Sequence, residues 1–381
     1  MPRLRSLLQR LRESLFVVPV LIILGCAGLA AITLWLDTLY TDDIDASSFL
    51  LASTVAGGRS IVTTVAGATM TVSAIVFSIT ALSSQIAANQ YSPRAVSGFF
   101  EDSFQQLVIG LIVGTFTYCL LVLGSLSSSI AGAADPTPSI AITLAVVLGV
   151  ASAIGIVGYI DHSLRRFQVG SVVRRIARAT VAALERNHSS EGTIEVDQGS
   201  TSLPETSAVI KADMSGWVQV IDARTLARSL PSDTIARVAV RLGEPISKGD
   251  HLMTIWPDPG DQAGIHRTIR RSIRAGRDRS LDNDPSFGIR QLVDIALKAL
   301  SPGINDPTTA VDVLHHLKVP IREILEAEAP RRVFQGPSGQ RVYLAETPSR
   351  SQSVHAAFAE IRLASTGQPS VMAALLEVLG D

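Results

Sequence analysis

The feature that most constrains this chain is a set of four long apolar stretches without a single charged residue, all in the first 160 residues. They lie at about residues 16-36, 61-86, 107-126 and 139-160. At about 1.5 Å per residue, each is long enough as a helix to cross the hydrocarbon core of a bilayer. We therefore expect a membrane α-helical protein with four transmembrane helices in residues 1-160.

The composition supports a lipid bilayer as the main partner. The chain has 381 residues, 47% of them hydrophobic and 18% charged, whereas soluble proteins carry about 25% charged residues. The formal net charge of -1 gives no basic face for nucleic acid, so none is expected as a partner. Cys26 and Cys119 both lie in apolar stretches, which argues against a disulfide framework and against a cysteine zinc site.

The basic residues predict the direction of the spans. The N-terminal arm has four arginines, and five more follow span four: Arg165, Arg166, Arg174, Arg175 and Arg178. Residues 37–58 contain four aspartates and no basic residue. Because basic residues stay on the cytoplasmic side, both termini are expected in the cytoplasm of a bacterial cell, around a multi-pass inner (plasma) membrane protein. The first apolar run is too long for a signal peptide, whose apolar core has roughly 7–15 residues.

Span two is unusually polar for a membrane helix. At steps of three and four, it carries a stripe of small and polar residues: Ser60, Thr64, Gly67, Thr71, Ala74, Ser78, Ala81 and Gln85. Such positions share one helix face. The stripe is either a seam for close helix packing or the lining of a water-filled path repeated in a homo-oligomer. In the second case, the pore-lining candidates are Ser60, Thr64, Thr71, Ser78 and Gln85.

The predicted spans contain no ionisable residue. Proton-relay carriers and voltage sensors need charge inside the membrane, so a passive path for a small ion or solute is the transport mode left open. Its cytoplasmic mouth would lie between spans two and three, with Arg94, Glu101 and Asp102 as candidates. The same segment also fits an ordinary connector anchored at the membrane interface by Phe99 and Phe100.

The chain beyond the spans predicts an α+β cytoplasmic domain. We expect a helical connector at 161-190, a small β module at 191-260 and a helical domain at 261-381. The phrases SGWVQVID and VRLGEPISKGDHLMTIW resemble the two halves of a lipoyl-like β-barrel. The segment between them has no lysine, so a swinging-arm cofactor is not expected.

The most distinctive stretch is DNDPSFGIRQLVDIALKALSPGINDPTTAVDVLHHL, residues 282–317. Asp306 stands at a favourable N-cap position before Pro307, which explains this turn without a ligand. The alternative is a cytoplasmic binding motif that includes Asp284, Asn305 and Asp306. No spacing typical of metal ligands is present, so no metal is expected.

The sequence shows no nucleophile elbow, P-loop, kinase motif set or dinucleotide fingerprint. We therefore expect that the protein is not an enzyme, with no catalytic residues and no cofactor.

Three segments carry a resemblance to a known family: YSPRAVSGFFEDSFQQ, GTFTYCLLVL and DPSFGIRQLVDIALKALSPGINDPTTA. With them the chain resembles a bacterial family of predicted integral membrane proteins of unknown function, and ALSPGINDPTTA is the most specific element. The resemblance implies an integral membrane protein with a large cytoplasmic domain. It implies no activity and no catalytic residues.

Two functional hypotheses follow. The first is a channel-like or passive transport homo-oligomer in which span two lines the path. The alternative is a membrane-anchored scaffold or sensor whose cytoplasmic domain binds a partner or a small ligand.

Overall fold

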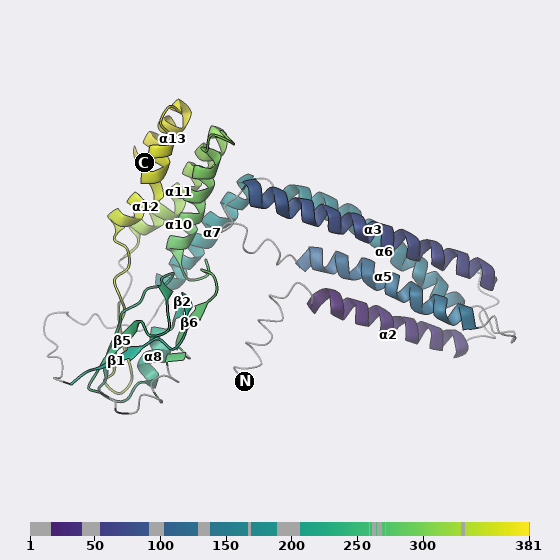
Figure 1. Cartoon of the computed structure of the whole chain (residues 1–381), viewed down its shortest axis with the longest axis horizontal. Helices are drawn as coiled ribbons and strands as arrows, with labels where there is room; N and C mark the ends of the chain where they lie inside the picture. Colours follow the sequence, from purple (N-terminus) through teal and green to yellow (C-terminus); the bar gives the residue numbers. More distant parts are fainter. Residues whose placement is uncertain are drawn as a thin grey trace. The chain divides into compact units, whose positions relative to one another are not determined.

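The chain forms two compact units, Met1–Gln168 and Val169–Asp381, seen in the computed structural model of Figure 1. We call them the membrane unit and the C-terminal unit. The structure describes residues 17–39, 54–90, 103–128, 138–166, 169–188, 206–258, 272–328 and 332–380, together with residues 260, 264, 269 and 270.

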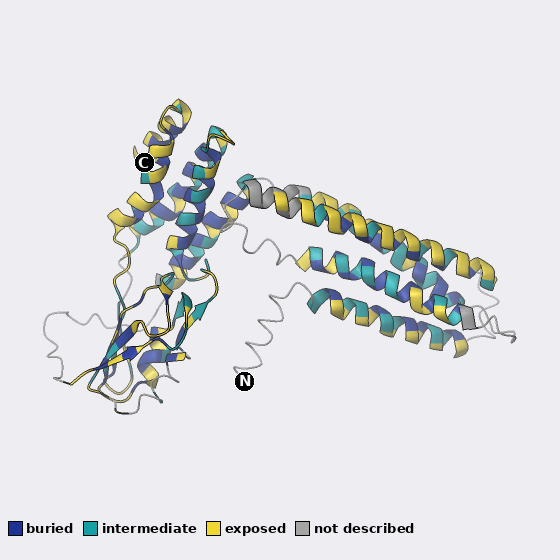
Figure 2. Cartoon of the chain, viewed as in Figure 1, coloured by how far each residue is buried: buried dark blue, intermediate teal, exposed yellow. Residues whose placement is uncertain are grey.

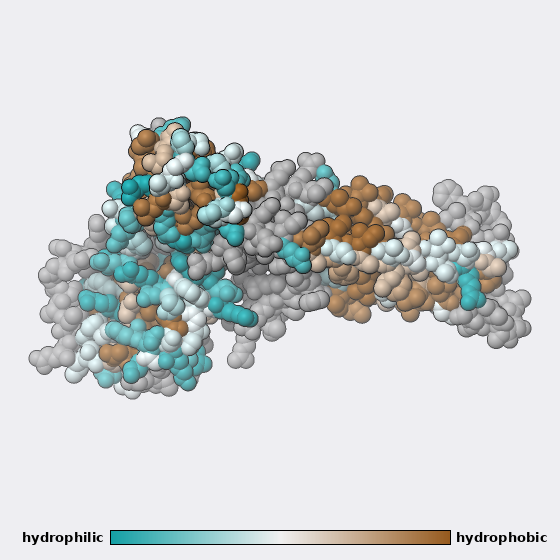
Figure 3. Space-filling model, turned by 45° about the horizontal axis from the view of Figure 1, so that its top comes forward, coloured by the Kyte–Doolittle hydropathy of each residue, from teal (hydrophilic) through white to brown (hydrophobic). Residues whose placement is uncertain are grey.

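The membrane unit contains four apolar helices, as predicted. They are α2 (Val17–Leu39), α3 (Val55–Gln90), α5 (Ser103–Ser128) and α6 (Ser139–Arg166). Each includes a segment long and apolar enough to cross a membrane, and large apolar residues cover much of the surface seen in Figure 3. All four helices extend beyond the predicted spans, because polar residues at the ends of a span continue its helical hydrogen bonding.

Helix α5 is the centre of the membrane unit. It packs against α2, α3 and α6, and it is the most buried of the four (Figure 2). Gly110 and Gly114 allow this close packing, since an added Cβ at Gly110 would lie 2.7 Å from the Cδ1 of Ile22 in α2. Small residues are the usual means by which membrane helices approach closely.

Five helices form one part of the C-terminal unit. They are α7 (Val169–His188), α10 (Pro285–Ala299), α11 (Pro307–Glu326), α12 (Arg350–Ala364) and α13 (Pro369–Gly380). Helices α7, α10 and α11 pack against one another, α12 packs on α10, and α13 packs on α11. Helix α10 buries an apolar face that includes Leu292, Val293 and Ala296.

The strands form two sheets around a shared core. The strands are β1 (Ala208–Lys211), β2 (Gly216–Ile221), β3 (Ile235–Val238), β4 (Pro245–Ile246), β5 (His251–Trp256), β6 (Ile273–Gly276), β7 (Val333–Gln335) and β8 (Arg341–Tyr343). One sheet has the order β1-β5-β3-β8-β7 and the other β4-β2-β6. Among the strands that the structure describes, only β3 and β8 pair in parallel. The short helix α8 (Ala223–Ser229) buries Leu226 in the same core as Leu252 and Ile255.

The expected lipoyl-like barrel is not supported, because the described strands form two open sheets and no closed barrel. The first resembling phrase forms β2, which pairs with β4 and β6. The second phrase is divided, because β4 joins β2 while β5 pairs with β1 and β3. Strands β7 and β8, from beyond residue 330, complete the larger sheet. Pairing with a distant segment therefore decided how the larger sheet is formed.

Candidate functional site

The polar stripe of span two lies on the outer face of α3. All eight members, from Ser60 to Gln85, are exposed within the single chain, and this exposed face runs along α3 in Figure 2. The stripe is therefore not a packing seam between helices of one chain.

The hydroxyl groups of the stripe bind only their own helix in the hydrogen bonds resolved for them. Thr64 Oγ1 donates to the carbonyl of Ser60 (2.8 Å), Thr71 Oγ1 to that of Gly67 (2.9 Å) and Ser78 Oγ to that of Ala74 (2.8 Å). A hydroxyl that donates once still has acceptor lone pairs. The stripe therefore presents a column of oxygen acceptors to whatever covers this face.

Hydroxyl groups inside the bundle behave differently, because they pair between helices. Thr115 of α5 and Ser152 of α6 are hydrogen-bonded at 3.0 Å, and both are buried. Thr80 of α3 and Tyr159 of α6 are hydrogen-bonded at 2.6 Å. The side-chain hydrogen bonds between these helices thus come from hydroxyls outside the stripe.

Large apolar side chains border the stripe on both sides. Met70 and Phe77 are about half exposed, as are Ile75 and Leu82. Residues seven apart lie on nearly the same side of a helix, at about 3.6 residues per turn. Met70 and Phe77 therefore form one flank of the stripe, and Ile75 and Leu82 form the other.

The ends of the stripe are only partly described. Arg59, one residue before Ser60, is exposed and is the one ionisable residue in the sequence of α3. Gln85 is exposed at the other end. The mouth candidates Arg94, Glu101 and Asp102 lie outside the described residues.

A charged residue that the sequence placed outside span one belongs to the interior of the membrane unit. Helix α2 continues to Leu39, and Asp37 is buried within it. Its two carboxylate oxygens accept hydrogen bonds from the backbone N–H groups of Ile140 and Ala141, each at 2.9 Å. Asp37 thus caps the N-terminus of α6, where backbone donors have no partner within the helix. The sequence signal was an aspartate directly after an apolar run.

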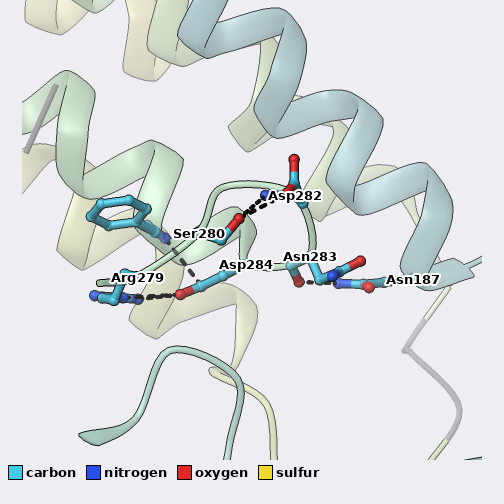
Figure 4. A network of polar contacts seen from close by, with 7 residues as sticks. Asn187, Arg279, Ser280, Asp282, Asn283 and Asp284 are labelled. Carbon is cyan, nitrogen blue, oxygen red and sulfur yellow. Dashed lines mark hydrogen bonds and ion pairs between the residues drawn. The ribbon is translucent and has the colours of Figure 1, made fainter. Parts of the chain in front are cut away.

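Asp284, the first residue of the predicted cytoplasmic motif, caps α10 and forms a buried ion pair. Its Oδ1 accepts from the backbone N–H of Phe287 at 3.1 Å, and its Oδ2 lies 2.6 Å from Nη2 of Arg279 (Figure 4). The Arg279 guanidinium also lies over the rings of Phe287 (4.9 Å) and Trp217 (5.8 Å). Burial raises the pKa of the Asp284 carboxyl above its ordinary value, although the charge and hydrogen bonds of Arg279 oppose this shift. Sequence reasoning did not identify Arg279 as the partner.

The segment around Asp284 joins the helices to the strands of the C-terminal unit. Arg186 of α7 donates to the carbonyl of Asp282, and Asn187 donates to that of Asn283 at 3.2 Å (Figure 4). The Asn283 side chain donates in turn to the carbonyl of Gln219 in β2, at 3.3 Å. These bonds hold α7, β2 and the start of α10 together.

The other two motif residues also have clear structural contacts. Asp306 caps α11, accepting from the backbone N–H of Thr309 at 3.1 Å and from its hydroxyl at 2.6 Å. These bonds lower the pKa of the Asp306 carboxyl. Asn305 has a positive φ of 47°, and its Oδ1 accepts from Nε2 of Gln368 at 3.0 Å.

The motif residues are not brought together at one place. Asp284 lies at the start of α10, and Asp306 lies beyond its end, at the start of α11. The 15 residues of α10 separate the two aspartates by roughly 20 Å. Within the described part of the chain, no group of three or more His, Cys, Asp or Glu side chains is placed to hold a metal ion. Asp284 and Asp306 therefore have helix-capping contacts, while Asn305 stands in a turn and bonds to Gln368.

Four helices able to cross a bilayer, followed by a mixed α/β unit, define the class as a polytopic membrane protein. The chain belongs to the family described as "Predicted membrane protein (DUF2254)", whose model matches residues 12–381. The resemblance seen in the sequence is thereby confirmed.

Similar proteins occur in mycobacteria. The uncharacterized proteins Rv1290c of Mycobacterium tuberculosis (strain ATCC 25618 / H37Rv) and Mb1321c of Mycobacterium bovis are each 28% identical to this chain over 384 residues. The match covers 99% of this chain and 73% of each relative. No solved structure matches the chain significantly.

Proposed function

We propose that copies of this chain assemble in the membrane so that α3 of each copy lines a passive path for a small ion or solute. The observation that carries the proposal is the exposed polar stripe of α3, from Ser60 to Gln85. A helix that faces lipid normally exposes apolar side chains, whereas polar residues in membranes face other protein or a water-filled cavity.

The two flanks of the stripe favour a ring of copies. If the stripe faces a central axis, the Met70 and Phe77 flank of one copy lies near the Ile75 and Leu82 flank of the next. This head-to-tail contact is heterologous, and it closes into a ring when the rotation per copy divides the circle. The apolar flanks then seal the copies against each other, while the polar column stays in water.

The chemistry of the stripe fits downhill passage. Between Ser60 and Gln85 the sequence of α3 has no ionisable residue, so the path offers no group for a proton relay. The acceptor oxygens of Thr64, Thr71 and Ser78 replace part of a solute's hydration shell. In this proposal the protein has no catalytic role, and both termini lie in the cytoplasm of a bacterial cell.

Solute flux through reconstituted full-length protein tests the proposal. Thr71→Leu combined with Ser78→Leu should reduce flux at least several-fold, because leucine replaces the acceptors by apolar bulk. Thr38→Leu is the matched control, since Thr38 is also exposed and donates to its own helix, at the carbonyl of Trp35, but lies on α2. Equal flux from all three proteins and from empty liposomes, for every common ion, would exclude the proposed path.

A second candidate function, a membrane-anchored scaffold or sensor, is favoured by the apolar surface of α13. Met372, Leu376 and Leu379 are exposed there at 37%, 69% and 52%, and their spacing places them on one helix face. Such a face is typical of a protein contact, and Asn305 and Asp306 already accept hydrogen bonds from Gln368 and Thr309. Leu376→Glu should abolish retention of a partner in pull-downs, while Glu377→Gln, at an exposed position about 100° around the helix from Leu376, should not. If neither variant changes the retained proteins, this candidate loses its support.

A further inference from the structure

The first half of α7 exposes a strongly basic face. Ser171, Arg174, Arg175 and Arg178 are all exposed, and steps of three and four place them on one side of the helix. The sequence of α7 from Val169 to Leu184 contains no acidic residue. Glu185, the first one, stands two turns after Arg178.

The opposite face of α7 is fixed in the core of the C-terminal unit. Val172, Val173 and Ile176 are buried, and α7 packs against both α10 and α11. Thr180 lies directly against Gly288 of α10, where even one added methyl group would collide with its hydroxyl. Helix α7 is therefore unable to rotate and bury its arginines without breaking this contact.

The start and the far end of α7 both have contacts with neighbouring segments of the C-terminal unit. Asp312 of α11 lies beside Gly170, and its carboxylate is 3.3 Å from Nδ1 of His316. The carbonyls of Asp282 and Asn283 bind the far end of α7, through Arg186 and Asn187. Arg174, Arg175 and Arg178 lie on the exposed face between these two contacts.

The position of this face in the chain indicates its partner. Helix α6 ends at Arg166, and α7 begins at Val169, so the three arginines follow a membrane-spanning helix within about a dozen residues. We propose that the basic face of α7 binds the anionic phospholipid headgroups of the adjacent bilayer surface. Basic segments next to a span are attracted to anionic lipids, and guanidinium groups bind phosphate oxygens in bidentate fashion. This proposed lipid contact does not depend on whether α3 lines a path.

The test uses the full chain in nanodiscs. The introduced cysteine of Ser171→Cys takes a fluorescent label, because the native Cys26 and Cys119 are buried. Lipids with a spin label on the headgroup then quench the fluorescence when α7 lies at the bilayer surface. We expect stronger quenching in discs with phosphatidylglycerol than in discs of phosphatidylcholine alone. Each lost arginine should weaken the contact about fivefold, so Arg178→Gln should raise the phosphatidylglycerol content needed for half-maximal quenching.

Two triple variants separate this contact from general electrostatics. Replacing Arg174, Arg175 and Arg178 by Gln should lower quenching to the phosphatidylcholine level. Replacing Arg224, Arg228 and Arg241, which are exposed on the strand-containing part, by Gln removes the same charge and should leave quenching unchanged. Equal quenching in both lipids, or no change in the α7 triple variant, overturns the proposal. Loss of quenching in inorganic phosphate, but not in potassium chloride of equal ionic strength, overturns it as well, because the face is then a site for soluble anions.

Discussion

At the scale of single residues, two aspartates cap the N-termini of helices in different surroundings. Asp284 and Asp306 each accept from the backbone N–H three residues later and start a helix at a proline. Asp284 is buried and paired with Arg279, whereas Asp306 is half-buried and bonded mainly to Thr309. Sequence alone predicted the cap at Asp306, because capping depends on a few neighbouring residues.

The two caps should therefore differ in their contribution to stability. Asp306→Ala removes a cap and should cost about 1 kcal/mol, whereas Asp284→Ala also leaves Arg279 unpaired and should cost about 3 kcal/mol or more. For a unit of this size, the unfolding temperatures should fall by about 3 °C and about 10 °C. Thermal unfolding of the full chain in detergent measures both. Asp306→Asn keeps the capping oxygen and loses only the charge, so it should cost less than Asp306→Ala. Equal losses for the two alanine variants would contradict the burial argument.

The pH dependence of stability should show the shift at Asp306. The folded pKa of this carboxyl is lowered, so its stabilising contribution is present above the ordinary aspartate pKa and is lost as pH falls through the folded pKa. The shift at Asp284 has the opposite sign, because a raised folded pKa favours the native state at low pH and this advantage is lost as pH rises.

Unfolding free energies of the wild type and Asp306→Asn, measured from neutral to acidic pH, should converge as pH falls. A difference that stays constant over this range would show that the Asp306 charge does not stabilise the fold.

At the scale of elements, the α2–α6 contact depends on one carboxylate. Asp37 accepts two backbone hydrogen bonds at the start of α6, and nearby Tyr118 of α5 donates to the carbonyl of Ala141 at 3.0 Å. This polar contact ties three helices at one end of the bundle. The sequence analysis placed Asp37 just after the first span, because hydropathy shows only where the apolar residues end. It carries no information on hydrogen-bond partners about a hundred residues away, such as Ile140 and Ala141.

Removing the Asp37 cap should loosen this end of the bundle. Asp37→Leu leaves two buried N–H donors without partners and should lower stability by about 2–4 kcal/mol. Asp37→Asn keeps one acceptor and should lose less. Thermal unfolding in detergent measures the loss, with exposed Thr38→Leu as the neighbouring control. If Asp37→Leu unfolds at the wild-type temperature, the cap is dispensable.

At the scale of the whole molecule, the proposed ring makes a geometric prediction about neighbouring copies. Ile75 and Phe77 lie on opposite flanks of the stripe and are 49% and 52% exposed. A chain with Ile75→Cys and Phe77→Cys should therefore cross-link in membranes into a ladder of bands that ends at the ring size. Either single variant lacks one half of the head-to-tail contact and should give no ladder.

The matched control for this cross-linking has cysteines at Ile154 and Val157 of α6, which are exposed at 68% and 70% and face outward without a polar stripe. A ladder from this control, or none from the α3 pair, would contradict an assembly through α3.

The sequence by itself determined the features that depend on near neighbours in the chain. Uncharged apolar runs predicted the four spans, and Asp-Pro predicted the start of α11. Such signals are local, because hydropathy and capping each involve only a few adjacent residues.

Only the tertiary structure decided which surfaces meet. It assigned β4 and β5 to different sheets, brought Asp37 to the start of α6 and paired Arg279 with Asp284. It also left the α3 stripe outside, while Thr80 of the same helix bonds to Tyr159 of α6. These outcomes arise from packing between segments far apart in sequence, where the best fit of whole faces, rather than any local preference, sets the partner.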